Sequence, residues 1–474
     1  MLKIAEIGIK KKGAEVYNLY EPETNMEGRQ TDMKKFPENF MLGASTAAHQ
    51  VEGNNIHSDY WAQEQMEHSS FVEPSLDAVD HYHHYEEDIR LMAEAGLNAY
   101  RFSIEWARIE PEEGKFDIEE LEHYRKVIRC CRANGIEPVV TLLHFTSPRW
   151  LIEKGGWEAE STVTYFARYC AYVVIQLGEE LNYVCTINEA NMGLQVAAIG
   201  RRYMQQMQKQ AAEQKNGGSA EKEGTAAEKL EGSVQVGLNM ESLLKRQKAV
   251  EEENIQVFGT ANPQIFVSSR TPEGDLLVMR AHEAARDAMK AIRPDLKIGL
   301  TLSLHDIQAQ PGGEKAAEKE WEEEFRHYLP FIRNDDFLGV QNYTRTLMGA
   351  DGSLPAPEGA ELTQMNYEFY PEALEHVIRK VAEEFQGELL VTENGIATAD
   401  DTRRVEFIRR ALQGVQACIQ DGIPVKGYMH WSLLDNFEWQ KGFSMMFGLI
   451  AVDRKTRTRY PKPSLAYLGS WRQA

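Results

Sequence analysis

Short apolar runs alternate with amphipathic segments along the sequence, and this alternation constrains the fold more than any other feature. Eight apolar, β-branched runs predict strands: Met41–Ala48, Ala99–Ile104, Pro138–His144, Tyr183–Asn188, Ile298–Ser303, Phe337–Tyr343, Leu389–Thr392 and Val425–Trp431. Six amphipathic segments between them predict helices: Tyr82–Ala95, Ile118–Ala133, Thr162–Leu181, Leu277–Ile292, Pro371–Phe385 and Thr402–Asp421. Strands that alternate with helices pair in parallel and connect through right-handed crossovers.

Eight parallel strands fit a closed barrel better than an open sheet. At 474 residues the chain could hold two or three domains, but eight-stranded α/β barrels with insertions reach this length as one domain. No G-x-G-x-x-G opens a helix, so a dinucleotide-binding sheet lacks its signature. We predict an α/β fold, a single (β/α)8 TIM barrel over residues 36–474.

Residues 1–35 precede the barrel as an N-terminal extension. Within them, Ile4–Ile9 and Ala14–Tyr20 are joined by Lys10–Gly13 and predict a small hairpin. No motif in this extension points to a function.

A long insertion, about residues 200–275, lies between the fourth strand and its helix. Tyr203–Gln214 is typical of a helix, the composition of Lys215–Gly232 predicts a flexible loop, and a further helical stretch and a strand near Gln264–Ser268 follow. Insertions after a barrel strand lie over the face that carries the active site. Two roles stay open for it: a lid or side wall of the substrate site, or a contact between protomers of a homo-oligomer.

The formal charge of −21, from 73 acidic and 52 basic residues, excludes some partners. Such a field repels nucleic acid and anionic membrane surfaces, so we expect neither as a partner. No stretch reaches the roughly 20 apolar residues of a membrane span, and the N-terminus has no apolar signal-peptide core. The five cysteines form no C-x-x-C pair, which favours reduced thiols. We predict a cytoplasmic protein.

Three histidines in His81-Tyr-His83-His84 raise the question of a metal site. They stand at the start of the helix predicted at Tyr82–Ala95, and adjacent side chains on a helix point to different faces. We therefore expect surface or helix-capping roles for these histidines, and no metal.

Two glutamates stand directly after predicted strands. Glu189 follows Tyr183–Asn188 and Glu393 follows Leu389–Thr392, the fourth and seventh strands, whose ends face each other across a barrel mouth. Hydrolysis of a glycosidic bond needs such a pair: one carboxylic acid protonates the leaving oxygen, and one carboxylate attacks the anomeric carbon or activates water. Position alone is weak evidence, because most glutamates at strand ends are helix-entry or ion-pair residues.

Motifs in order along the chain strengthen this interpretation. They are Phe36–Phe40, Gly43–Gly53, Tyr100–Trp106, Thr186–Glu189, Thr392–Gly395, Trp431–Trp439, Phe447–Leu449 and Val452–Asp453. With these motifs the chain resembles family 1 glycoside hydrolases from about residue 36 to the C-terminus, apart from the insertion. The resemblance implies a retaining β-glycosidase that needs no metal or cofactor.

The resemblance also implies residue roles. Glu189 is the expected acid/base and Glu393 the expected nucleophile, about 5–5.5 Å apart in a retaining site. The negative charge of Glu393 is expected to raise the pKa of Glu189. Arg101 is expected to keep Glu393 ionised, and Tyr343 to hydrogen-bond it. The expected sugar-binding residues, whose polar groups bind hydroxyls and whose indoles stack on C–H faces, are Gln50, His144, Asn188, Trp431, Glu438 and Trp439.

Three residues depart from the family pattern. Ala190 follows Glu189 where proline is usual, Phe145 follows His144 where tryptophan is usual, and Gln341 stands where asparagine is common. None of these changes removes a catalytic group. Phe145 lacks an indole N–H for a sugar hydroxyl, so we expect an altered preference for the sugar.

Terminal neutral β-D-glycosides, and β-glucosides first among them, are the expected small-molecule substrates. A 6-phospho-β-glycosidase is the close alternative, but that subgroup carries a Ser/Lys/Tyr phosphate cradle and usually lacks the Glu438–Trp439 pair kept here. The other alternative is a non-catalytic sugar-binding relative. Such proteins typically lose one catalytic glutamate, and both stand in this sequence.

Overall fold

The computed structural model describes residues 36–202 and 247–473. The described residues from Phe36 on belong to one compact unit. The hairpin predicted within residues 1–35 and the predictions for Tyr203–Gln214 and Lys215–Gly232 lie outside the described residues. No helix within the described ranges is long and apolar enough to cross a membrane.

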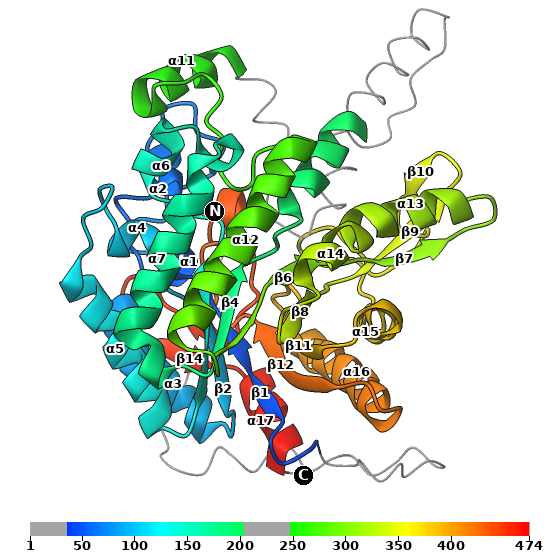
Figure 1. The fold of residues 1–474 in the computed structure, drawn as a ribbon. Coiled ribbons are helices and arrows are strands. Elements are labelled where there is room, and N and C mark those ends of the chain that lie inside the picture. Colours follow the sequence, from blue (N-terminus) through cyan, green and yellow to red (C-terminus); the bar gives the residue numbers. More distant parts are fainter. Residues whose placement is uncertain (1–35, 203–246, 474) are drawn as a thin grey trace, which may run out of the picture. The chain divides into compact units, whose positions relative to one another are not determined.

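Parallel strands form a closed barrel, which confirms the predicted TIM-barrel fold (Figure 1). In ring order they are β4 (Tyr183–Ile187), β3 (Glu137–Leu143), β2 (Ala99–Ser103), β1 (Met41–Ser45), β12 (Val425–Trp431), β11 (Glu388–Asn394), β8 (Phe337–Gln341), β6 (Thr301–Ser303) and β5 (Lys297–Gly299). β5 pairs with β4, and β6 pairs with β8. Only Leu300 separates β5 from β6, so the two pieces act as one fifth strand and close the ring.

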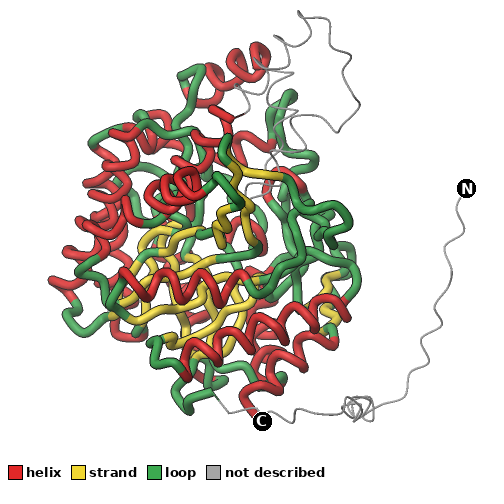
Figure 2. Tube along the Cα trace, turned by 90° about the vertical axis from the view of Figure 1, so that its right-hand side faces the viewer, coloured by secondary structure: helices red, strands yellow, loops and turns green. Residues whose placement is uncertain are grey.

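Helices surround these strands, which lie gathered inside them in Figure 2. The longer helices are α3 (His81–Glu94), α5 (Ile118–Ala133), α7 (Ser161–Leu177), α11 (Gln247–Phe258), α12 (Pro272–Ile292), α13 (Glu314–Glu324), α15 (Ala373–Glu384), α16 (Asp401–Gln420) and α17 (Pro463–Gln473). The short ones are α1 (Ala48–Val51), α2 (Asp59–Glu64), α4 (Trp106–Ile109), α6 (Arg149–Glu153) and α14 (Leu329–Ile332). Residues 192–202 are also helical. Single turns of 3₁₀ helix lie at Gly156–Glu158, Gly178–Glu180, Arg326–Tyr328 and Trp439–Lys441.

Two small sheets lie outside the barrel. One contains β7 (Asp306–Ala309), β9 (Arg345–Gly349) and β10 (Gly352–Leu354), and the other contains β13 (Ile450–Val452) and β14 (Arg459–Pro461).

The barrel interior changes from apolar to polar along the strands. One cluster of buried apolar side chains lies on the barrel strands: Met41, Ala99, Val139, Cys185, Phe337, Leu390 and Met429. Side chains two residues further along a strand point the same way, and on β2 and β3 these are Arg101 and Thr141, both fully buried. On these two strands the polar residues therefore lie nearer to the C-terminal mouth than the apolar residues of the cluster.

Outside the insertion, each predicted strand and helix is present with bounds within a few residues, although the fifth strand is divided at Leu300. The eighth strand and the second helix have the predicted bounds. The strand predicted near Gln264–Ser268 is wrong, because this segment is a turn in which the Ser268 N–H donates to the Ile265 carbonyl (3.1 Å). The turn buries Phe266 against Trp157, with ring centroids 5.0 Å apart. Its apolar residues therefore fill a gap between elements instead of pairing in a sheet.

The helix after the fourth strand begins earlier than predicted. Its first residue is Pro272, because the preceding Thr271 caps it by accepting the Gly274 N–H (3.0 Å). Thr and Pro in these two positions are a common start of a helix.

The histidines at the start of α3 do not share a site. His83 is exposed and pairs with Asp80, the residue before the helix. The surface role predicted for His81 is wrong: this ring is buried between Asp88 (2.8 Å) and the Tyr100 hydroxyl (3.1 Å).

Candidate active site

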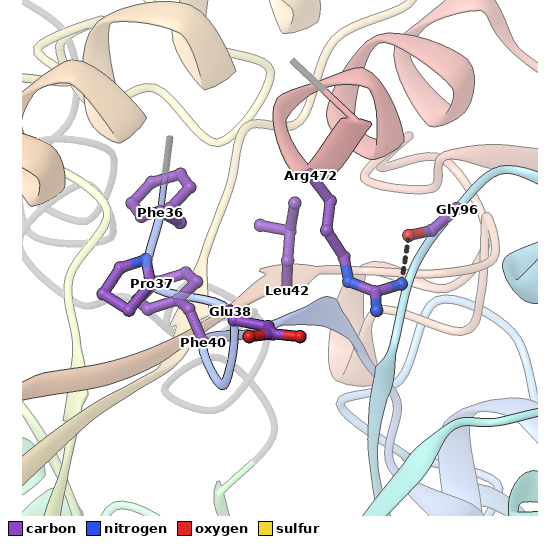
Figure 3. A pocket seen from close by; sticks show the side chains of 7 residues that line it. All are labelled: Phe36, Pro37, Glu38, Phe40, Leu42, Gly96 and Arg472. Atoms are coloured by element: carbon purple, nitrogen blue, oxygen red, sulfur yellow. Dashed lines mark hydrogen bonds between the residues drawn. The ribbon is translucent and has the colours of Figure 1, made fainter. Parts of the chain in front are cut away.

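Two pockets lie at opposite ends of the barrel strands. The larger, with about 580 Å³ of empty space, lies beside the start of β1 and is lined by Phe36, Pro37, Glu38, Phe40, Leu42, Gly96 and Arg472 (Figure 3). Phe36 stacks on Phe40 at a centroid distance of 4.2 Å, and Arg472 donates to the Gly96 carbonyl (3.3 Å). Its lining offers a single carboxyl group, Glu38, and therefore lacks a carboxyl pair.

The second pocket lies at the C-terminal ends of the strands and has about 270 Å³ of empty space. It is lined by His144, Phe145, Asn188, Glu189, Tyr343, Glu393, Trp431, Glu438, Trp439 and Phe447. Most of these residues stand at or just beyond the ends of β3, β4, β8, β11 and β12, and Glu438, Trp439 and Phe447 lie between β12 and β13. Three carboxyl groups thus converge in one buried cavity.

Glu393 is held by two donors. The register of β11 with both neighbouring strands shifts around this residue, and such irregularities re-aim side chains beside functional sites. Arg101 Nη1 donates to Oε1 (2.6 Å), and the Tyr343 hydroxyl donates to Oε2 (2.6 Å). Bonds of this kind on both oxygens stabilise the ionised carboxylate.

Glu189 is placed by its backbone. Its φ of +45° lies in the left-handed region, which residues other than glycine rarely adopt and which is frequent at functional sites. The Glu189 N–H donates to Thr301 Oγ1 (2.8 Å), and the Ala190 N–H donates to the Thr301 carbonyl (3.0 Å). The side chain lines the pocket, where Oε2 has no hydrogen-bond partner among the described residues.

The two glutamates differ in proton affinity. Burial raises the pKa of Glu189 well above its usual range, and the charge of Glu393 raises it further. Burial also raises the pKa of Glu393, but Arg101 and the Tyr343 hydrogen bond oppose that rise. Glu189 is therefore the member of the pair that holds the proton.

Glu438 is the third carboxyl group of the pocket. Gln50, on α1, donates from Nε2 to the Phe437 carbonyl (2.7 Å) and to Glu438 Oε2 (3.3 Å). Burial, followed by the charge of Glu393, raises the pKa of Glu438 to about 8. At neutral pH this side chain is mostly a carboxylic acid, which can both donate and accept a hydrogen bond.

Aromatic rings form the rest of the wall. His144 stacks on Trp431 (centroids 5.6 Å apart) and on Trp439 (5.9 Å), and Phe145 lies 5.2 Å from Trp439. Burial lowers the pKa of His144 well below its usual range, so its ring is neutral. Its Nε2 lies 3.1 Å from Asn188 Nδ2 and accepts from it, so the proton sits on Nδ1. Nδ1 has no partner within the described ranges and is left for a ligand.

The structure brings the ten predicted site residues together. Eight of them line the pocket. The other two lie behind it: Arg101 bonds Glu393, and Gln50 bonds Glu438.

Sequence reasoning missed three residues of the site. Phe447 lines the pocket although only its motif was recognised. Thr301 holds the turn of Glu189 and stands in no motif. Gln341, identified only as a departure from the family pattern, donates to Asn188 (2.7 Å).

One group among the described residues could hold a metal ion: Glu67, His68 and Glu253. None of the three lines the pocket. His68 Nδ1 lies 2.7 Å from Glu253 Oε1, which connects the segment after α2 to α11.

Known proteins are similar to this chain in sequence and in fold. The glycosyl hydrolase family 1 model matches residues 32–216 and 336–473. The chain is 30% identical over 466 residues to beta-glucosidase A of Acetivibrio thermocellus, covering 90% of this chain and 96% of that protein. It is 26% identical over 464 residues to 6-phospho-beta-galactosidase 1 of Streptococcus pneumoniae, covering 92% and 98%. The crystal structure of beta-glycosidase BGL167 matches with a TM-score of 0.78 at 44% identity, covering 92% of this chain and 97% of that one.

The two matched segments contain the two strand ends that meet in the pocket: Glu189 lies in the first segment and Glu393 in the second. The match covers more than half of the sequence, and its interruption contains most of the insertion after β4 together with α12, the fifth strand and α13. This chain belongs to glycosyl hydrolase family 1.

Proposed function

We propose that the protein is a retaining, exo-acting β-glycosidase that hydrolyses terminal neutral β-D-glycosides, with β-glucosides as its main substrates. The observation that carries the proposal is the unequal pair of buried carboxyl groups. Glu393 has a donor on each oxygen, whereas Glu189 is protonated and has an oxygen without a partner in the described part of the chain.

In this proposal, Glu393 attacks the anomeric carbon while Glu189 gives its proton to the glycosidic oxygen, so the aglycone leaves as a neutral alcohol. The sugar is then an ester of Glu393, which has lost its charge. Without that charge the pKa of Glu189 falls, and its carboxylate takes a proton from the water that attacks the same carbon. Two inversions retain the configuration, and both glutamates return to their first states.

The charge of the pocket lining suits an uncharged sugar. Three carboxyl groups line the pocket, and no lysine or arginine among the described residues does. A 6-phosphate would add about −1.5 to −2 charges at neutral pH with no cation of the lining to neutralise them.

Turnover of p-nitrophenyl β-D-glucoside and of its 6-phosphate tests this function. We expect kcat/KM at least about tenfold higher for the neutral substrate. NMR of the first-formed sugar is expected to show the β anomer. Faster cleavage of the phosphate would contradict the proposed substrate, and an α anomer formed first would contradict the retaining mechanism.

We also propose that the insertion forms part of the pocket wall. Phe266, in its described end, stacks on the pocket residue Phe145 at a centroid distance of 6.0 Å. Deleting Lys215–Gly232 is expected to change kcat/KM for long aglycones more than for short ones. Unchanged kinetics with a changed oligomeric state would instead assign the insertion to a contact between protomers.

We propose, finally, that residues 36–474 are the catalytic domain and that the protein acts in the cytoplasm. All five cysteines are free thiols, as is usual in a reducing compartment. Activity of a chain without residues 1–35 tests the first point, and cell fractionation tests the second.

A further inference from the structure

We propose that Gln341 is a positioning residue that fixes the Asn188 amide so that its NH₂ group faces the substrate hydroxyl next to the anomeric carbon. This inference rests on the proposed roles of Glu189 and Glu393.

Three donors converge on the side-chain oxygen of Asn188. They are Gln341 Nε2 (2.7 Å), Arg101 Nη2 (2.5 Å) and Thr301 Oγ1 (3.2 Å). An amide oxygen has two lone pairs, so this oxygen is saturated and the amide cannot turn it toward a ligand. One N–H of the amide faces His144 Nε2 (3.1 Å). The other N–H is left for the substrate, because Asn188 lines the pocket.

Gln341 differs from the other two donors because they have further tasks in the site. Arg101 also bonds Glu393, and Thr301 Oγ1 also accepts the Glu189 N–H. The Gln341 side chain is fully buried, and its Oε1 has no partner among residues 36–202 and 247–473. A buried amide with an unsatisfied oxygen is unfavourable for folding. Its donation to Asn188 is therefore the contact that gives this polar side chain a function.

The position of Gln341 also suits this role. It stands at the end of β8, in register with Glu393 on one side and with Ser303 on the other. Asn188 directly precedes Glu189, and Arg101 bridges Asn188 and Glu393. A free N–H in this place meets the 2-hydroxyl, since that group is attached next to the carbon that Glu393 attacks.

The effect is expected on the rate more than on substrate binding. Hydrogen bonds to the 2-hydroxyl of a glycoside strengthen in the transition state, and interactions made there raise kcat. Without Gln341, the Asn188 oxygen keeps only Arg101 and Thr301 as donors, and both also bond the glutamate pair, so the amide is held less firmly in its orientation. The N–H is then no longer aimed at the 2-hydroxyl.

Gln341→Met removes the donor and keeps the length of the side chain. Gln195→Met is the matched control: Gln195 is buried, donates from Nε2 to a carbonyl (Ser303, 2.8 Å) and has an unsatisfied Oε1 in the described chain. Both variants lose one buried amide bond, but Gln195 does not donate to Asn188. The ratio of kcat/KM for p-nitrophenyl β-D-glucoside to that for its 2-deoxy analogue is measured for each.

We expect Gln341→Met to lower that ratio about tenfold, the effect of one well-aimed hydrogen bond, through kcat and with KM changed less than threefold. Gln195→Met is expected to keep the wild-type ratio. Equal losses of Gln341→Met on the two substrates would show a merely structural role and overturn the proposal.

The orientation is also tested without activity. In a crystal structure of Gln341→Met we expect the Asn188 amide to be turned from its wild-type orientation. An Asn188 amide that stays in place would overturn the inference. A wild-type enzyme inactive on every aryl β-glycoside would overturn the proposed function instead, and the crystal structure would still decide on Gln341.

Discussion

The ends of β4 and β11 present the same side chain in different surroundings. Glu393, after β11, has donors on both carboxylate oxygens. Glu189, after β4, lies in a left-handed turn and has one oxygen without a partner among the described residues. Both are buried, with exposed fractions of 4% and 2%. Burial therefore cannot separate their roles, and the donors around them do.

This difference shows how one residue type supplies both an acid and a nucleophile. Burial alone would keep both glutamates protonated, because it penalises the charged form of each. Arg101 and Tyr343 oppose this effect for Glu393. The charge that they stabilise on Glu393 then raises the pKa of Glu189. The proton affinity of the acid thus depends on the contacts of the nucleophile.

The largest expected effect comes from Glu393→Gln, which removes the proposed nucleophile. We expect kcat on p-nitrophenyl β-D-glucoside to fall about 10⁴-fold or more, because no glycosyl ester forms. Glu38→Gln, in the pocket at the other end of the strands, is the control and is expected to keep wild-type kinetics. A Glu393→Gln enzyme with a tenth of the wild-type rate would contradict the assignment.

Glu189→Gln is expected to lower kcat/KM by about 10²- to 10⁴-fold, the usual contribution of a general acid. The loss is expected to be smaller for a 2,4-dinitrophenyl glycoside than for an alkyl glycoside. The 2,4-dinitrophenolate leaves without a proton, whereas an alkyl alcohol needs one. The alkaline limb of the pH profile, which reports loss of the Glu189 proton, is also expected to disappear. Equal losses with both aglycones would show that Glu189 does not protonate the leaving group and would contradict its assignment as the acid.

Tyr343→Phe weakens the difference between the strand ends without removing a carboxyl group. The lost bond to a charged oxygen is worth about 1.5–3 kcal/mol, or about 10- to 150-fold in kcat/KM. Glu393 then loses a donor that stabilises its ionised form, so its pKa rises. The acid limb of the kcat/KM profile is expected to move to higher pH. An acid limb that stays in place would show that Tyr343 does not act on the ionisation of Glu393.

Much of the barrel could be predicted because each strand is a local apolar run followed by an amphipathic helix. The division of the fifth strand at Leu300 could not be predicted. A side chain at Gly299 would place its Cβ 2.1 Å from the Phe337 carbonyl, a contact with a distant strand that the local pattern Ile298–Ser303 does not contain. The three-stranded sheet of β7, β9 and β10 was missed because its strands are short and partly exposed.

The candidate active site also has a part that could be predicted from the sequence and a part that could not. Residues inside long motifs could be predicted to share one pocket, as with Glu438 and Trp439. The contacts that orient the acids were not predictable, because Thr301 and Gln341 reach Asn188 from other strands. A single sequence shows which residue types are present but not which of their atoms meet. The unequal pKa values of the two glutamates arise from such contacts between side chains of different strands.

The smallest expected effect concerns Glu438, the third carboxyl group, which accepts a hydrogen bond from the neutral Gln50 amide. Its pKa in the folded protein is raised to about 8 by burial and then by the charge of Glu393. Because the folded state binds the proton more tightly than the unfolded state, the stability from this group is complete below the unfolded pKa and is lost as pH rises toward about 8. Between pH 6 and 7 the wild type is therefore expected to lose up to about 1.4 kcal/mol relative to Glu438→Gln. Urea unfolding of both proteins at the two pH values measures this, and a free-energy difference independent of pH would show that Glu438 is ionised in the folded state.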